Sequence, residues 1–143
     1  MCSRIGPFLL AAVLLFGACG TAPERVTIVA AGQTLTVEVA RTEAQRERGL
    51  MERTNLGPRD GMIFIFDRDD HLTFWMKDTP TALSIAFLSA EGKVLQIADM
   101  EPFSQSTIRS RRAARYALEM KKGAFAELGI REGDTFAFPQ SFP

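Results

Sequence analysis

The sequence predicts a mainly β domain, a small sandwich or distorted barrel of about eight short strands with one or two short helices. Short stretches that alternate apolar and polar residues, or are apolar throughout, recur along most of the chain, and turn residues separate them. One longer run of good helix formers interrupts this series. Because regular β–α alternation is missing, we do not expect a doubly wound α/β sheet.

The first elements are a hairpin and a helix. Residues 26–39 alternate apolar and polar side chains on both sides of an Ala-Gly-Gln turn, which predicts a β-hairpin. Thr42 and Gln45 have the spacing of a capping box, and residues 43–53 are mostly helix formers. We expect a helix there, with Gly49 in its last turn or in close contact with a neighbour.

Short strands follow in series. The expected strands cover residues 62–66, 71–76, 83–88, 93–99 and 115–120. A Ser-Ala-Glu-Gly turn joins the third and fourth of them as a hairpin. A short helix over residues 124–129, capped by its final glycine, and a last strand within residues 130–139 complete the expected fold.

The first 18 residues are expected to be an export signal. Arg4 is the only charge before Glu24, and residues 8–16 are apolar throughout, followed by small residues. This order describes a secretory signal. A membrane-spanning helix needs about 20 apolar residues, so the run is too short to be one. A buried core helix is the alternative, but such a helix would normally have a polar face.

Cys19 is the expected site of a lipid anchor. The three residues before it, Phe-Gly-Ala, resemble the bacterial lipobox, in which a small residue precedes the acylated cysteine. Cys2 is the only other cysteine and leaves with the signal, so Cys19 has no disulfide partner. Acylation would explain an unpaired cysteine in an exported protein.

These expectations divide the chain into a signal (1–18), a lipidated cysteine with a tether (19–24) and a single β-rich domain (25–143). The protein would then be periplasmic or anchored to the outer membrane, with the membrane as its partner through the lipid on Cys19. Ordinary cleavage near Ala18 or Gly20, which would give a soluble periplasmic protein, stays open as the alternative.

Composition constrains the class of partner. The chain has 17 basic and 17 acidic residues, and removal of Arg4 leaves 16 basic residues against 17 acidic ones. Nucleic-acid-binding domains are usually basic overall, so no nucleic-acid partner is expected. Hydrophobic residues make up 46% of the chain, which is enough for a core without a disulfide.

Six segments occur in an order and spacing that resemble the domain-of-unknown-function family 192. They are GLMER (49–53), GMIFIFD (61–67), FWMKDT (74–79), IAFLSAEGKV (85–94), ARYALEM (114–120) and GIREGD (129–134). The resemblance implies a jelly-roll-like β domain and no particular chemistry. The family often has Asn in place of Asp78 and an aspartate in place of Ser84, so a role of that aspartate is not expected here.

The FWMKDT segment supplies the first candidate binding residues. Strand alternation places Phe74 and Met76 on one face and Trp75 and Lys77 on the other. An aromatic wall beside a cationic donor suits a small polar, sugar-like or anionic ligand, and Thr79 could add a hydroxyl group. Alternatively, Trp75 covers one end of the domain and Lys77 forms a surface ion pair.

The ARYALEM segment supplies the second group. Arg115 and Glu119 lie two alternations apart on one strand face. Together with Lys77 or Asp78 they could form a polar cluster in a pocket, although a solvated strand face would give the same pattern. The expected site residues are Trp75, Lys77, Asp78, Thr79, Arg115 and Glu119.

No catalytic or metal-binding set follows from the sequence, and no cofactor is expected. His71 is the only histidine, and neither a Gly-x-Ser-x-Gly nucleophile motif nor a set of zinc ligands accompanies it. Five dispersed methionines could bind Cu(I) through their sulfur atoms or simply fill the core; they are Met51, Met62, Met76, Met100 and Met120.

We therefore expect a non-catalytic ligand-binding or accessory domain of the cell envelope. Two alternatives remain. One is a hydrolase that acts on an envelope component through Glu119, Asp78 or His71, and the other is a periplasmic Cu(I)-binding protein.

Overall fold

The computed structural model describes residues 23–140 and Phe142. The expected export signal and the lipidation site Cys19 lie outside the described residues. Within them the fold is mainly β, as predicted, with eight strands and two short helices. None of the helices in the described part of the chain is long and apolar enough to cross a membrane.

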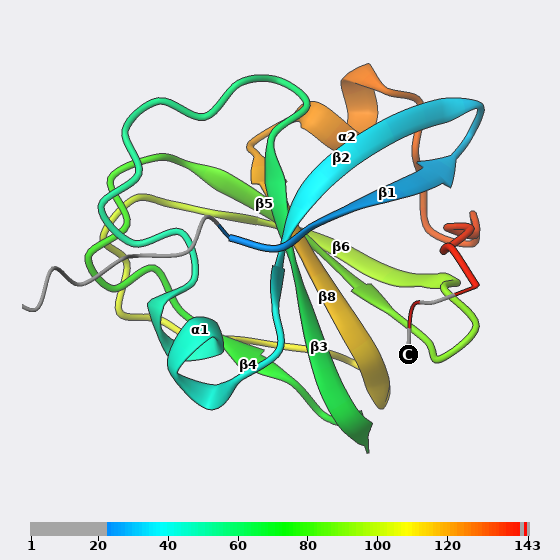
Figure 1. The fold of residues 1–143 in the computed structure, drawn as a ribbon. Helices are drawn as coiled ribbons and strands as arrows, with labels where there is room; N and C mark the ends of the chain where they lie inside the picture. The colour runs from blue at the N-terminus through cyan, green and yellow to red at the C-terminus, as the bar shows by residue number, and fades with distance from the viewer. Residues whose placement is uncertain (1–22, 141, 143) are drawn as a thin grey trace, which may run out of the picture.

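Six strands form one large sheet, and two short strands form a second (Figure 1). The order in the large sheet is β1 (Arg25–Ala30), β2 (Gln33–Ala40), β3 (Gly61–Asp70), β8 (Ala114–Lys121), β5 (Leu83–Leu88) and β6 (Val94–Met100). Strand β4 (Thr73–Phe74) pairs with β7 (Ile108–Arg109). All pairs are antiparallel except β2 with β3. The order is open, so the sheet does not close into the expected alternative, a barrel.

The two faces of the central strands support separate hydrophobic cores. Ile63 and Leu118 belong to a core that the β1–β2 hairpin and α2 (Ala124–Glu127) cover. Phe64 and Ala117 belong to the opposite core, which the β4 and β7 region covers together with the segment after α1 (Glu43–Arg48). Strand alternation thus divides the apolar residues between two layers.

Helix α1 has the predicted capping box but is shorter than predicted. The backbone N–H of Gln45 donates to the Thr42 hydroxyl at 3.2 Å, and the N–H of Thr42 donates to the Gln45 side chain at 3.0 Å. The helix ends at Arg48 because Gly49 has a φ of +47°. A Cβ atom at Gly49 would lie 3.3 Å from the ring of Phe64, so the chain turns in close contact with β3.

The prediction of a last strand within residues 130–139 is wrong. Only two isolated bridges form there, between Val29 and Ala137 and between Lys93 and Thr135. Because the two bridges reach different parts of the sheet, no continuous ladder develops. The hairpin over β5 and β6 is confirmed, whereas the two-residue strand β7 was not predicted, because it is too short to show a periodic pattern.

Candidate functional site

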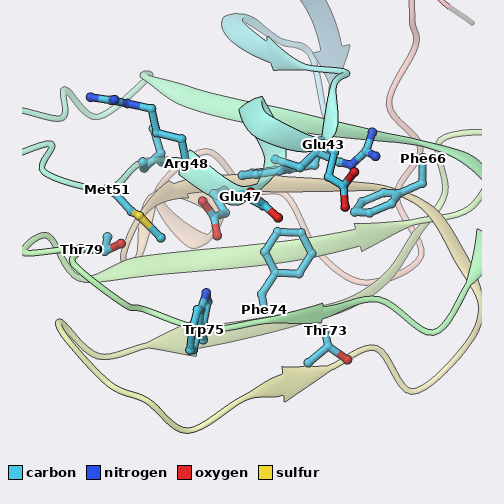
Figure 2. A pocket seen from close by; sticks show the side chains of 14 residues that line it. Glu43, Glu47, Arg48, Met51, Phe66, Thr73, Phe74, Trp75 and Thr79 are labelled. Atoms are coloured by element: carbon cyan, nitrogen blue, oxygen red, sulfur yellow. The ribbon is translucent and has the colours of Figure 1, made fainter.

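A cavity of about 390 Å³ lies between α1 and β4 (Figure 2). Its lining comes from α1 and the turn after it, from β3 and β4, and from Glu119 on β8. Small-ligand sites are typically clefts of about 300–1,000 Å³ with apolar walls and a few convergent polar groups. The cavity falls within that range, and its lining combines four aromatic rings with three carboxyl groups.

Helix α1 forms one side of the cavity. Glu43, Arg46 and Glu47 stand at positions i, i+3 and i+4, so they share one helix face, and all three line the cavity. The helix has no buried residues. It therefore contributes polar groups to the cavity and does not pack an apolar face into the core.

The other walls are aromatic. Phe64 and Phe66 lie two residues apart on β3 and point to the same side of the sheet. The ring of Phe74 meets them edge-on, with centroid distances of 5.0 Å to Phe64 and 6.4 Å to Phe66. Trp75 also lines the cavity and is 48% exposed, so its ring is reachable from solvent.

Glu119 is the buried ionisable group of the cavity. Its residue is only 4% exposed, and its neighbours in the sheet register are the apolar residues Met62 and Ile85. Burial raises the pKa of its carboxyl group from 4.5 to about 8. The group is therefore mostly protonated at pH 7. Among the described residues nothing forms a hydrogen bond or ion pair with its side chain.

The two arginines of the lining are engaged elsewhere. The Arg46 guanidinium donates to the carbonyl oxygens of Arg41 and Ile65 and lies 5.0 Å from the centroid of the Phe66 ring. Arg48 forms an exposed ion pair with Glu52 at 3.4 Å. In Figure 2 its side chain points away from Phe74.

Glu47, in contrast, extends from α1 toward the ring of Phe74 (Figure 2). Its carboxylate has no ion pair or hydrogen bond with any other described residue. The cavity thus has a free carboxylate on α1 and a neutral, buried carboxyl group on β8.

Three of the six expected site residues meet at this cavity: Trp75, Thr79 and Glu119. Trp75 and Lys77 do point outward while Met76 is buried, as predicted. The Lys77 ammonium lies 5.5 Å from the centroid of the Trp75 ring but is not part of the cavity lining.

Asp78 and Arg115 lie elsewhere. Asp78 is exposed with a φ of +51°, a conformation that Asn and Asp tolerate better than most residues, and its carbonyl accepts a hydrogen bond from the N–H of Glu52. Arg115 shares a face of β8 with Glu119, as expected, but pairs with Asp69 at 2.7 Å. The expected cluster of Arg115 with Glu119 therefore does not form.

Sequence reasoning missed the contributions of α1 and β3. Glu43, Glu47, Phe64 and Phe66 all line the cavity and were not among the expected site residues. One signal was present: residues 43–48 lack an apolar stripe, which a helix packed on a core would have.

His71 and Ser84, which are not part of the cavity lining, have hydrogen-bonding neighbours within the fold. His71 is exposed, and its Nδ1 atom lies 2.9 Å from the carbonyl oxygen of Ser110. Ser84 is buried, donates to Asp99 and accepts from the N–H of Gly123. Within the described ranges, no group of three or more His, Cys, Asp or Glu side chains could hold a metal ion.

The methionines are divided between the two hydrophobic cores and the cavity. Met62, Met76 and Met100 are buried in the core next to the cavity, whereas Met120 belongs to the core on the opposite face of the sheet. Met51 is half-buried and lines the cavity. Ligands of a single Cu(I) ion must meet at one point, and Met120 lies on the other side of the sheet from the rest. The burial of Met62, Met76 and Met100 among apolar side chains fits core packing.

Residues 26–138 match the family DUF192, described as Uncharacterized ACR. A comparison with curated proteins gives no match. Among solved structures, the chain is similar to a protein of Sinorhizobium meliloti described as a candidate transcription regulator, with 35% identity, a TM-score of 0.77 and coverage of 85% of this chain and 98% of the other. It is also similar to a protein of unknown function from Novosphingobium aromaticivorans, with 32% identity, a TM-score of 0.73 and coverage of 83% and 94%.

Proposed function

This chain belongs to the DUF192 family, and we propose that it is a non-catalytic protein of the cell envelope that binds a small polar ligand in the cavity between α1 and β4. The observation that carries the proposal is the carboxyl group of Glu119, a residue only 4% exposed that lines the cavity and has no hydrogen-bond or ion-pair partner among the described residues.

No side-chain oxygen or nitrogen of the described residues is both fully buried and without a hydrogen-bond partner, so the Glu119 oxygens are accessible from the cavity. A purely structural glutamate would normally have acquired hydrogen-bond partners in the fold, as the buried Ser84 has done here. A ligand in the cavity could therefore supply the hydrogen bonds that the fold does not give to Glu119. The aromatic rings around it would hold the apolar part of the same ligand.

The place of action in this proposal is the cell envelope. Residues 1–18 would direct export, and the lipid on Cys19 would attach the mature protein to a membrane. Mass spectrometry of the protein from membranes tests this part. A mature N-terminus at Cys19 with the mass of added acyl chains is expected, and an unmodified soluble form that starts after Cys19 would contradict the anchor.

Hydrolysis of an envelope component is the second candidate function. A carboxyl group that is still protonated at pH 7 can act as a general acid. Glu119 has this property because burial raises its pKa to about 8, and Glu47 offers a second carboxylate at the same cavity. Asp78 and His71, the other expected catalytic groups, do not line it. In a hydrolase, Glu119→Gln would abolish turnover, whereas in a binding protein no turnover occurs.

Ligand binding can be followed without a label, because Trp75 is the only tryptophan and lines the cavity. We suggest titrating the protein with a panel of small sugars, amines and carboxylic acids while recording the fluorescence of Trp75 and the thermal unfolding temperature of the protein. A ligand at 100 times its Kd stabilises the folded state by about 2.7 kcal/mol.

A blocked cavity provides the control for this titration. Thr73 lies on an exposed strand position in the cavity lining, so Thr73→Phe would fill part of the cavity with a ring. Thr34→Phe makes the same change at an exposed position of β2 that is outside the lining. Binding should be lost in the first variant and kept in the second. If no compound binds, or if Thr73→Phe leaves binding intact, the proposed function is wrong.

A further inference from the structure

We propose that the ligand of this cavity is an organic cation, an amine or quaternary ammonium compound with a hydrocarbon body, held between the carboxyl groups of Glu47 and Glu119 and the aromatic rings. This inference rests on the proposed function, because it names the chemical class of the ligand for the same cavity.

Among the described residues, the ionisable groups of the lining without an ion pair or hydrogen bond are carboxyl groups. Three carboxyl groups and two guanidinium groups line the cavity. Arg46 is held by two backbone carbonyls, and Arg48 is paired with Glu52. Glu47 and Glu119 have no ion pair with any of the described residues. A cation would therefore find partners in the cavity that an anion would not.

The aromatic lining favours the same charge. A cation above a ring face is attracted by the ring quadrupole, and the attraction grows when both groups are shielded from water. Two of the lining rings already bind cations of the chain itself: Arg46 lies over Phe66 at 5.0 Å and Lys77 over Trp75 at 5.5 Å. Phe64 and Phe74 provide further aromatic surface for the hydrocarbon part of a ligand.

Binding of a cation would be coupled to release of a proton. Burial alone raises the pKa of Glu119, to about 8, so the group must lose its proton before it can pair with a positive charge. The charged groups that share the cavity with it all come from α1 and are Glu43, Arg46, Glu47 and Arg48, while its neighbours on β3 and β5 are apolar. Affinity should therefore rise up to about tenfold per pH unit below the pKa and level off above it.

Choline and its neutral isostere, in which a quaternary carbon replaces the nitrogen, test the inference directly. The two probes have the same shape and differ in charge, and neither titrates near neutral pH. Trp75 fluorescence and calorimetry would give the Kd of each probe at about pH 6.5 and pH 9, on either side of the Glu119 pKa of about 8. We expect choline to bind at least about tenfold more tightly than the isostere at the higher pH.

Three variants locate the charge that the probe meets. Glu119→Gln should weaken choline binding about tenfold to hundredfold at the higher pH and remove its pH dependence. Glu47→Gln, which changes an exposed helix residue and leaves the core intact, should weaken binding about two- to fivefold at both pH values. Glu127→Gln, an exposed carboxylate of α2 outside the lining, should have no effect.

The outcomes separate this inference from the proposed function. Equal binding of choline and its isostere, or unchanged choline binding in both Glu47→Gln and Glu119→Gln, would overturn the inference. Binding of neutral sugars without any binding of cations would also overturn it, yet would leave the cavity as a ligand site. Absence of binding by every compound in the panel would refute both.

Discussion

Glu38 and Arg53 form a two-point ion pair in which the Nη1 and Nη2 atoms of Arg53 donate to the two carboxylate oxygens of Glu38, at 3.1 and 2.8 Å. Glu38 lies on β2 and is only 9% exposed, whereas the Arg53 side chain is 45% exposed. Because Arg53 follows α1 in the chain, the pair fixes the segment after that helix to the large sheet.

Arg53→Met should lower the free energy of unfolding by about 1–3 kcal/mol at neutral pH, because it leaves the Glu38 carboxylate buried without its partner. Urea unfolding measures the change. The matched control is Arg48→Met, which breaks the exposed pair with Glu52 and should cost less than about 0.5 kcal/mol. Equal losses in the two variants would contradict the interpretation.

Thr42→Ala should destabilise the protein by about 1 kcal/mol, because it removes the side-chain half of the capping box of α1. The same change should weaken ligand binding, since α1 carries Glu43 and Glu47 into the cavity. Thr42→Ser keeps the hydroxyl group and should restore both properties. Trp75 fluorescence titration and urea unfolding check the two effects separately.

Gly92→Ala should be more damaging than an ordinary glycine substitution. Gly92 has a φ of +83°, and an added Cβ would lie 2.4 Å from the carbonyl oxygen of Phe136. Gly133 has a φ of +96° but no atom within 4 Å of its Cβ position. Gly133→Ala should therefore cost about 1 kcal/mol from backbone strain alone, and Gly92→Ala at least about 2 kcal/mol more because the backbone must move. Similar unfolding midpoints would disprove the steric argument.

Glu119 should make the protein less stable as the pH rises. The folded pKa of about 8 is above the ordinary value of 4.5, so between these values the unfolded chain loses a proton that the folded protein keeps. The free energy of unfolding then falls by up to about 1.4 kcal/mol per pH unit in this window and becomes level above it.

Glu119→Gln removes this dependence. The free energy of unfolding of the variant, relative to that of the wild type, should rise by a few kcal/mol between about pH 5 and pH 8.5. This is the energy that corresponds to the difference between the folded and unfolded pKa of Glu119. Denaturant unfolding at the two pH values measures it, with Glu127→Gln as the control that changes an exposed carboxylate. A constant difference across the range would show that Glu119 is ionised in the folded protein.

Local patterns predicted much of the fold. The capping box of Thr42 and Gln45, the hairpin over residues 26–39 and the strand over residues 83–88 all depend on neighbours in sequence, and all are present. The last strand was predicted wrongly, because residues 135 and 137 each bridge to a different partner. Which partner a segment meets is not encoded in its own alternation.

In the candidate site, too, local sequence predicted some features and only the tertiary structure showed the others. Alternation along FWMKDT correctly predicted that Trp75 faces outward and Met76 inward. Alternation along β8 placed Arg115 and Glu119 on one face, but only the structure separated them into an exposed ion pair and a buried carboxyl group. Burial depends on what covers a strand, and the strand sequence does not contain that information.

The sequence by itself determined the mainly β class, the capped helix, the family segments and the outward position of Trp75. Only the tertiary structure decided that α1 lies opposite β4, that Glu119 is enclosed without a partner among the described residues, and that Lys77 stays outside the cavity. The physical reason is that alternation and capping act between near neighbours in the chain. A cavity and a raised pKa arise from the joint packing of segments far apart in the chain, such as those of Glu47 and Glu119, which are 72 positions apart.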